Sequence, residues 1–218
     1  MSISIAIDGP AGAGKSTIAK MLAKKLGYIY VDTGAMYRAM ALYIMRQNVN
    51  AEDSEKISAE CKNADISITY KDGAQVVVLN GEDVNGLIRT EEVGNMASAT
   101  SVNPDVREKL VELQRILASK ENVVMDGRDI GTVVLPNANV KIFLTASSKV
   151  RAQRRFLELQ SKGIEADINK IEADIIERDN RDMTREISPL RRAEDAYFLD
   201  SSSMTVDEVV AKIIEING

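Results

Sequence analysis

Histidine is absent from this 218-residue sequence, and cysteine occurs only at Cys61. Without histidine, the protein lacks the most common general base and the most common metal ligand. A single cysteine cannot form an internal disulfide, and its place in a helical pattern predicts an inert, small apolar side chain. No apolar run approaches the roughly 20 residues of a membrane helix, and a strand pattern stands where a secretion signal would begin. We therefore expect a cytoplasmic protein that does not engage a membrane.

Acidic residues also outnumber basic ones in this sequence. The sequence has 28 Lys and Arg residues against 33 Asp and Glu residues, which gives a net charge of −5. This acidic balance argues against a general nucleic-acid-binding surface, which is normally basic. The arginines are nevertheless unevenly spread, because five of them lie within residues 178–192. We expect a locally cationic cleft on an otherwise acidic body.

The order of apolar segments predicts an α/β fold in one domain. Short strands alternate with helices, which is typical of a parallel sheet flanked by helices. The five expected strands cover residues 2–7, 28–31, 123–125, 140–144 and 197–199. Two charged helices are expected at 149–162 and 168–182, and Thr205 with Glu208 predicts a capping box that opens a terminal helix. The length of the chain fits one domain with an inserted subdomain.

A hairpin pattern interrupts this alternation. Residues 66–70 and 75–79 read as two strands, and the turn between them, residues 71–74, contains Gly73. Thr90, followed by two glutamates, is typical of a helix N-cap. Antiparallel strands placed between parallel elements predict a small subdomain that extends to about residue 101.

A glycine-rich stretch after the first strand carries the clearest chemistry. Residues 9–16 fill the pattern G-x-x-x-x-G-K-[ST] between an apolar strand and a helix, which is the context of a phosphate-binding loop. Glycines leave backbone N–H groups open to a polyphosphate, and the helix adds its positive dipole end. In such a loop the lysine reaches the β and γ phosphates and the hydroxyl binds Mg²⁺. We predict a nucleoside triphosphate site formed by Gly9, Pro10, Ala11, Gly12, Ala13, Gly14, Lys15, Ser16 and Thr17, with Ser16 as the metal ligand.

Four segments carry a family resemblance. They are GPAGAGKST at 9–17, DTGAMYR at 32–38, DGRDIGT at 126–132 and ERDNRD at 177–182. Together they resemble the bacterial cytidylate kinases over the whole chain, the inserted hairpin included. The resemblance implies a core that binds ATP, an acceptor-binding insert and a mobile helical lid. On this basis the core comprises residues 1–32, 102–148 and 193–218, the insert about 33–101 and the lid about 149–185.

The same resemblance implies the reaction and the acceptor site. ATP would donate its γ-phosphoryl group to CMP or dCMP, with Mg²⁺, giving ADP and CDP or dCDP. The implied contacts are Arg38, Arg128 and Arg185 to the acceptor phosphate, Arg178 and Asp182 to the sugar, and Ser98, Arg107 and Asp129 to cytosine. Thr33 would hydrogen-bond the acceptor at a position where many family members have serine, and Tyr37 would line its pocket.

The expected chemistry needs no general base. An acceptor phosphate has a second pKa near 6, so it is largely deprotonated at neutral pH and is already a nucleophile. Catalysis would rest on in-line positioning, Mg²⁺ and the charges of Lys15, Arg128, Arg178 and Arg185. Asp126 could hold a Mg²⁺-bound water, but a carboxylate at a strand end equally serves as a turn or cap residue, and the same holds for Asp32.

Three other functions share parts of these patterns. A GTPase switch would carry N-K-x-D, but here Asn169 and Lys170 are followed by Ile171 and Glu172, without the aspartate. The acidic balance disfavours a nucleic-acid-dependent ATPase. A kinase of the same fold that acts on UMP, AMP or shikimate is the main alternative. We expect a monomer whose partners are small nucleotides.

Overall fold

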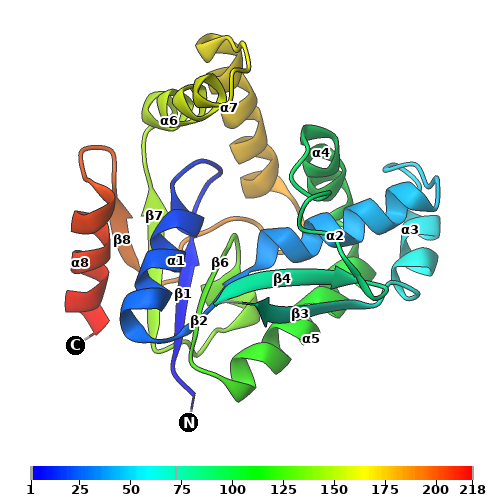
Figure 1. The fold of residues 1–218 in the computed structure, drawn as a ribbon, viewed down its shortest axis with the longest axis horizontal. Coiled ribbons are helices and arrows are strands. Elements are labelled where there is room, and N and C mark those ends of the chain that lie inside the picture. Colours follow the sequence, from blue (N-terminus) through cyan, green and yellow to red (C-terminus); the bar gives the residue numbers. More distant parts are fainter. Residues whose placement is uncertain (1, 72, 218) are drawn as a thin grey trace. The chain divides into compact units, whose positions relative to one another are not determined.

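Strands and helices alternate along most of the chain in the computed structural model (Figure 1), which describes residues 2–71 and 73–217. These residues form two units, one with the chain up to Tyr30 and from Glu121 onward, the other Val31–Lys120. Each unit has its own cluster of buried apolar side chains. Among the helices of the described ranges, none combines the length and the apolar content that a membrane crossing requires.

The first unit is built on a five-stranded sheet with the order β2-β6-β1-β7-β8. The strands of this sheet are β1 (Ser4–Asp8), β2 (Ile29–Asp32), β6 (Val123–Gly127), β7 (Val140–Thr145) and β8 (Tyr197–Asp200), and the chain passes from the first unit into the second within β2. The pairs β1–β6, β1–β7 and β7–β8 are parallel, and Ile5 lies opposite Val124 on one side and Val140 on the other. The predicted parallel sheet flanked by helices is confirmed.

Helices α1 (Lys15–Leu26) and α8 (Val206–Asn217) share one core with this sheet. Leu22 of α1 and Ile213 of α8 are fully buried together with Ile7 of β1, as their helical spacing predicts. The capping box that opens α8 is present: the backbone N–H of Thr205 donates to Glu208, and the backbone N–H of Glu208 donates to the Thr205 hydroxyl.

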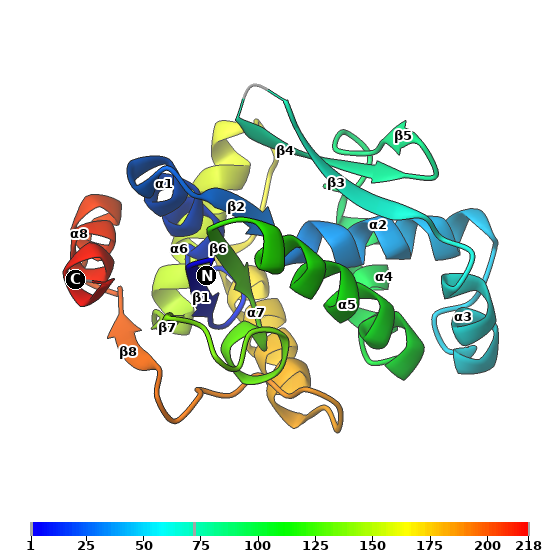
Figure 2. The same ribbon diagram turned by 90° about the horizontal axis from the view of Figure 1, so that it is seen from below.

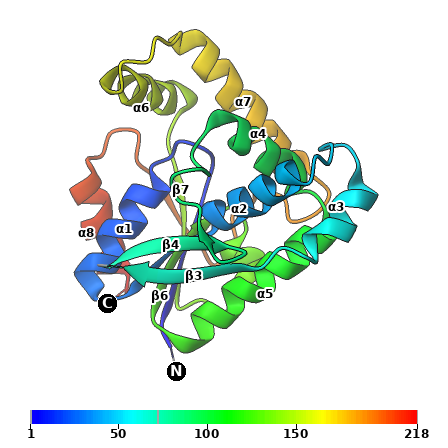
Figure 3. The same cartoon turned by 45° about the vertical axis from the view of Figure 1, so that its right-hand side comes forward.

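The two charged helices also lie where the sequence predicts them. They are α6 (Ser148–Ser161) and α7 (Ile168–Thr184), and Figure 3 shows them joined at one end. Gly163 at this connection has a φ of 70°, a left-handed conformation that favours glycine. The Ser148 hydroxyl donates to Glu172 over 2.7 Å and ties the two helices together. Since few of their side chains are buried, the pair is mostly solvated.

The second unit combines four helices with a small antiparallel sheet. The helices are α2 (Thr33–Arg46), α3 (Ser54–Cys61), α4 (Glu91–Thr100) and α5 (Pro104–Lys120), and the strands, visible in Figure 2, are β3 (Ile66–Lys71), β4 (Ala74–Leu79) and β5 (Glu82–Asp83). The predicted hairpin is therefore present, although Asp72 in its turn lies outside the described residues. Thr90 caps α4 as predicted, because its hydroxyl accepts the N–H of Val93.

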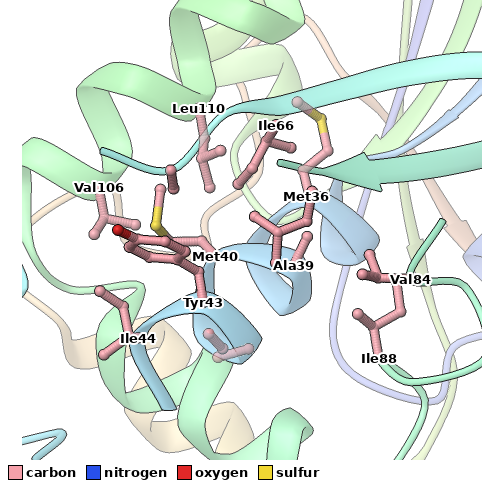
Figure 4. Packing of buried hydrophobic residues seen from close by; sticks show 14 of the residues in the cluster. Met36, Ala39, Met40, Tyr43, Ile44, Ile66, Val84, Ile88, Val106 and Leu110 are labelled. Atoms are coloured by element: carbon pink, nitrogen blue, oxygen red, sulfur yellow. The ribbon is translucent and has the colours of Figure 1, made fainter. Parts of the chain in front are cut away.

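The core of the second unit explains why it extends to Lys120. Figure 4 shows Met40 and Tyr43 of α2 directed toward Val106 and Leu110 of α5, and Ile66 of β3 belongs to the same buried cluster. The resemblance assigns residues 102–120 to the ATP-binding core. In the structure, the apolar face of α5 packs with α2 and α3, so α5 lies in the same compact unit as these helices. Cys61 is buried in the same cluster, as expected of a small apolar side chain.

Candidate active site

The phosphate loop lies between β1 and α1 in the first unit. Gly9 has a φ of 152°, and a side chain on it would meet the backbone oxygen of Leu144 at 1.9 Å, so only glycine fits against β7. Gly14, at the N-cap of α1, has a φ of 88° and no side chain that could cap the helix. The first N–H groups of α1 are therefore available to an anion at the positive end of the helix dipole.

Lys15 and Ser16, the first residues of α1, point their polar groups into this loop. The Lys15 ammonium donates to the backbone oxygen of Pro10 over 2.8 Å, and the residue is only 6% exposed. Burial and the nearby Arg128 charge lower the pKa of Lys15 to about 7, although Asp126 and Asp8 act in the opposite direction. The Ser16 hydroxyl donates to Asp126 over 2.9 Å, and the Tyr30 hydroxyl donates to the other oxygen of Asp126 over 2.8 Å.

The donor atoms around Ser16 fit Mg²⁺. This cation prefers oxygen ligands and, in phosphoryl-transfer sites, takes only one or two from the protein beside waters and phosphates. Ser16 and Asp126 provide a hydroxyl and a carboxylate in direct contact with each other. Within residues 2–71 and 73–217, no group of three or more His, Cys, Asp or Glu side chains is arranged to hold a metal ion.

Three of the predicted arginines gather around one carboxylate in the first unit. Arg128, just after β6, donates to Asp182 of α7 over 2.8 Å, and Arg185 lies 3.9 Å from the other oxygen of Asp182. Burial alone would raise the pKa of Asp182, but Arg128, Arg178 and Arg185 together hold this pKa below its usual value. Arg128 and Arg178 also act electrostatically on Lys15. One carboxylate thus faces three guanidinium groups, so this cluster by itself carries a net positive charge.

The loop after β6 rests on Asp8, the last residue of β1. One Asp8 oxygen accepts the N–H of Ile130 and the other accepts the N–H of Gly131, both over 2.7 Å. Asp129, which precedes these two residues, is 4% exposed and is the N-cap of η1 (Ile130–Val134), a single π-helical turn. Such turns often occur at functional sites.

Burial of Asp8 predicts a pH dependence of stability. Desolvation raises its pKa from 3.8 to about 6, although the N–H groups of Gly131 and Ile130 lower it. Between these pH values the folded protein keeps a proton that the unfolded chain releases, so stability falls as the pH rises. We expect the free energy of unfolding of the wild type, relative to Asp8→Asn, to fall by up to about 3 kcal/mol from pH 4 to pH 6. Urea denaturation of both proteins measures this, and a constant difference across the window would contradict the raised pKa.

The other predicted acceptor residues belong to the second unit. Arg107 of α5 is 4% exposed, donates to the backbone oxygen of Ser101 over 3.1 Å and lies over the ring of Tyr37, 5.4 Å from its centre. Thr33 is buried at the start of α2, and Ser98 is half-buried on α4. The structure therefore brings Tyr37 and Arg107 together within this unit.

Arg38 and Asp32 have defined partners in the same unit. The Arg38 guanidinium donates to the backbone oxygens of Ile88 and Thr90 over 3.1 and 3.2 Å. Asp32 caps α2 by accepting the N–H of Ala35 over 2.9 Å. Its other oxygen is 2.7 Å from Arg89, an ion pair with a largely buried carboxylate. Of the two roles that the sequence left open for Asp32, the structure shows the helix cap.

Sequence reasoning missed two arginines of α6 that hold the phosphate loop. Arg151 donates to the backbone oxygens of Ala146 and Ala11, both over 2.9 Å, and forms a 2.6 Å ion pair with Asp179 of α7. Arg154 donates to the backbone oxygen of Ala13 over 3.4 Å. Their spacing of three residues on a charged helix was the available signal, but it is equally typical of a solvated face.

The first unit thus carries two kinds of anion-binding element, a loop of backbone N–H groups and a cluster of guanidinium groups. Together with the parallel sheet, they define the class of P-loop kinases of small molecules. The shikimate kinase of Bacteroides thetaiotaomicron has the same fold, with a TM-score of 0.50 and 14% identity over 98% of this chain and 97% of that one.

The family follows from the sequence relatives. The model of the cytidylate kinase family matches residues 5–217. A cytidylate kinase of Caldicellulosiruptor saccharolyticus is 55% identical, and one of Carboxydothermus hydrogenoformans is 52% identical, each over 98% of this chain. The matches cover 95% and 96% of these two relatives. The chain belongs to the cytidylate kinase family.

Proposed function

We propose that this protein transfers the γ-phosphoryl group of ATP to CMP or dCMP and releases ADP with CDP or dCDP. The family match over residues 5–217 carries this proposal. The site adds physical support, because phosphoryl transfer between two nucleotides brings several negative charges together. Lys15 and the arginines around Asp182 supply the positive charge that such a reaction needs.

The phosphate loop binds the donor in this proposal. Backbone N–H groups of residues 9–17 surround the phosphates, and Lys15 leaves the Pro10 oxygen to contact the β and γ phosphates. Negative phosphates raise the pKa of Lys15, so the side chain is fully charged when ATP is bound. Ser16, with Asp126 beside it, would hold Mg²⁺, which neutralises charge on the transferring group when it is bound.

Each unit carries polar side chains that the proposal assigns to the acceptor. In the first unit, Arg128 and Arg185 bind its phosphate, Arg178 and Asp182 its sugar, and Asp129 its base. In the second unit, Arg38 binds the phosphate, and Thr33, Tyr37, Ser98 and Arg107 line the pocket or face the base. The acceptor oxygen attacks the γ-phosphorus as the bond to the ADP oxygen breaks. Since that oxygen is already deprotonated, the arginines need only orient it and stabilise charge.

A panel of acceptors tests the proposal. ADP release is measured with CMP, dCMP, UMP, AMP and shikimate at equal concentrations of MgATP. We expect CMP and dCMP to give the highest kcat/KM, UMP a lower value, and AMP and shikimate almost no turnover. A preference for AMP or shikimate would overturn the proposal while leaving the kinase class intact.

Hydrogen exchange tests the proposed lid. Helices α6 and α7 carry arginines that gain phosphate partners only when nucleotides are bound, so binding should order them. With an analogue that links adenosine and cytidine through phosphates, we expect exchange at 149–185 to slow about tenfold or more. Helix α8 serves as the internal reference, because it contributes no residue to the proposed sites. Unchanged protection at 149–185 with the analogue bound would rule out the lid.

A further inference from the structure

Two buried charges lie on neighbouring strands of the first unit, outside the residues proposed to contact nucleotides. Asp8 ends β1 and is 5% exposed, and Lys141 on β7 is 7% exposed. Their strands are paired, with Ala6 opposite Lys141. Charged groups are costly to bury unless they are fully hydrogen-bonded. The hydrogen-bond partners of these two side chains therefore indicate their role.

Asp8 holds the start of the loop that follows β6. Its two oxygens accept the consecutive N–H groups of Ile130 and Gly131, each over 2.7 Å. Two bonds from one carboxylate fix two successive peptide groups, and therefore the direction in which the preceding residues leave β6. Those residues are Arg128 and Asp129. Asp8 also immediately precedes Gly9, the first residue of the phosphate loop. Its side chain therefore connects the phosphate loop to the loop that follows β6.

Lys141 holds the far end of the same loop. Its ammonium donates to the backbone oxygen of Pro136 over 2.5 Å and to both oxygens of Asp195 over 2.9 and 2.7 Å. Its stem lies under Gly131, where an added side-chain atom would meet the Lys141 carbons at 3.2 and 3.3 Å and an Asp8 oxygen at 3.3 Å. The Asp8 carboxylate and the Lys141 stem thus both lie in contact range of Gly131.

We propose that Asp8 is a positioning residue for acceptor recognition, which fixes Arg128 and Asp129 relative to the phosphate loop, with Lys141 supporting the other end of their loop. The inference rests on the proposed function, in which Arg128 binds the acceptor phosphate and Asp129 faces its base. A displaced loop weakens acceptor binding and base choice. ATP binding depends on the glycine-rich backbone and Lys15 and is largely preserved.

The test separates positioning from a purely structural role. In Asp8→Asn, the amide oxygen still accepts one N–H, but the amide NH₂ faces the other, so one donor loses its partner. We expect the KM for CMP to rise about tenfold and the preference for CMP over UMP to narrow, while the KM for ATP changes by less than about twofold. Lys141→Met keeps the stem and removes the ammonium. This variant should raise the KM for CMP about threefold and reduce the preference for CMP over UMP about threefold. Asp207→Asn, a control with the same chemical change at an exposed carboxylate of α8, should stay within about twofold of wild type.

A loss of thermal stability with wild-type KM values and base preference in folded Asp8→Asn would overturn the inference. If Asp8→Asn does not fold, an unchanged KM for CMP in Lys141→Met overturns it instead. The CMP-to-UMP preference of Asp129→Asn is measured alongside. If this preference narrows in Asp129→Asn but not in Asp8→Asn, Asp129 recognises the base and only the positioning role of Asp8 is contradicted. If the wild type prefers another acceptor, the proposed function fails, and the same comparison of KM values is made with that acceptor.

Discussion

Replacing Lys15 with methionine should lower kcat by about 10²–10³-fold, because removing one charge aimed at the transferring group costs about 3–4 kcal/mol in the transition state. The fold should survive the change. Burial lowers the pKa of Lys15 to about 7, so holding the charged ammonium in the free protein costs stability. Methionine retains most of the apolar stem and removes this cost. The expected Tm is therefore equal to or above that of wild type, by differential scanning fluorimetry.

Lys24→Met is the matched control for Lys15→Met. Lys24 is exposed on the same helix, so the chemical change is identical and only the location differs. Its kcat should equal that of wild type within about twofold, since isolated surface charges contribute little. A folded Lys15→Met protein with near-wild-type kcat would show that the loop at residues 9–17 does not hold the reacting phosphates.

Changing Asp129 to asparagine should reduce the preference for CMP over UMP. A carboxylate only accepts hydrogen bonds, so it suits the exocyclic amino group of cytosine and opposes the carbonyl of uracil. Two acceptors facing each other in a buried site cost about 1–3 kcal/mol, or roughly 10–100-fold in kcat/KM. The side chain of Asp129 is 4% exposed, so water cannot easily relieve the conflict. The amide of the variant can instead donate to the uracil carbonyl. We therefore expect kcat/KM for CMP to fall and the ratio of kcat/KM for CMP to kcat/KM for UMP to decrease.

Two further variants define what the Asp129 result means. Asp129→Ala should weaken both acceptors without reversing their order, because it removes the acceptor and supplies no donor. Arg107→Ala should lower kcat/KM for CMP and UMP by similar factors, because the donors of Arg107 are assigned here to the ring carbonyl that both bases share. An unchanged CMP-to-UMP ratio in Asp129→Asn would remove Asp129 from base recognition.

Consecutive residues made the phosphate loop predictable. Gly9, Gly14, Lys15 and Ser16 owe their positions to one strand, one turn and one helix start, so their spacing in the chain already contains their geometry. The hairpin of β3 and β4 and the caps at Thr90 and Thr205 were local in the same sense. Even so, the burial of Lys15 was not evident, because its surroundings come from other parts of the first unit.

Contacts between distant residues had no such local signature. Asp8 meets Ile130 across 122 positions, and Ser16 meets Asp126 across 110. A lysine within an apolar strand, as at Lys141, signals something unusual but does not name its partners. Helix α5 is a related case, because its apolar stripe predicts a buried face but not the elements that cover that face.

Arg151 fixes the start of α6 in place through its contacts with the phosphate loop and with α7. It sits in the first turn of α6 and bonds to Ala11, Ala146 and Asp179, so the start of α6 is fixed both to the phosphate loop and to α7. The connection at Gly163 is the free end of a lever about 20 Å long, given the 14 residues of α6. A rotation of about 10° at the root would carry this tip about 3–4 Å, while Arg151 itself scarcely moves. Small angular changes beside the phosphate loop would thereby produce large displacements at the Gly163 end of α6.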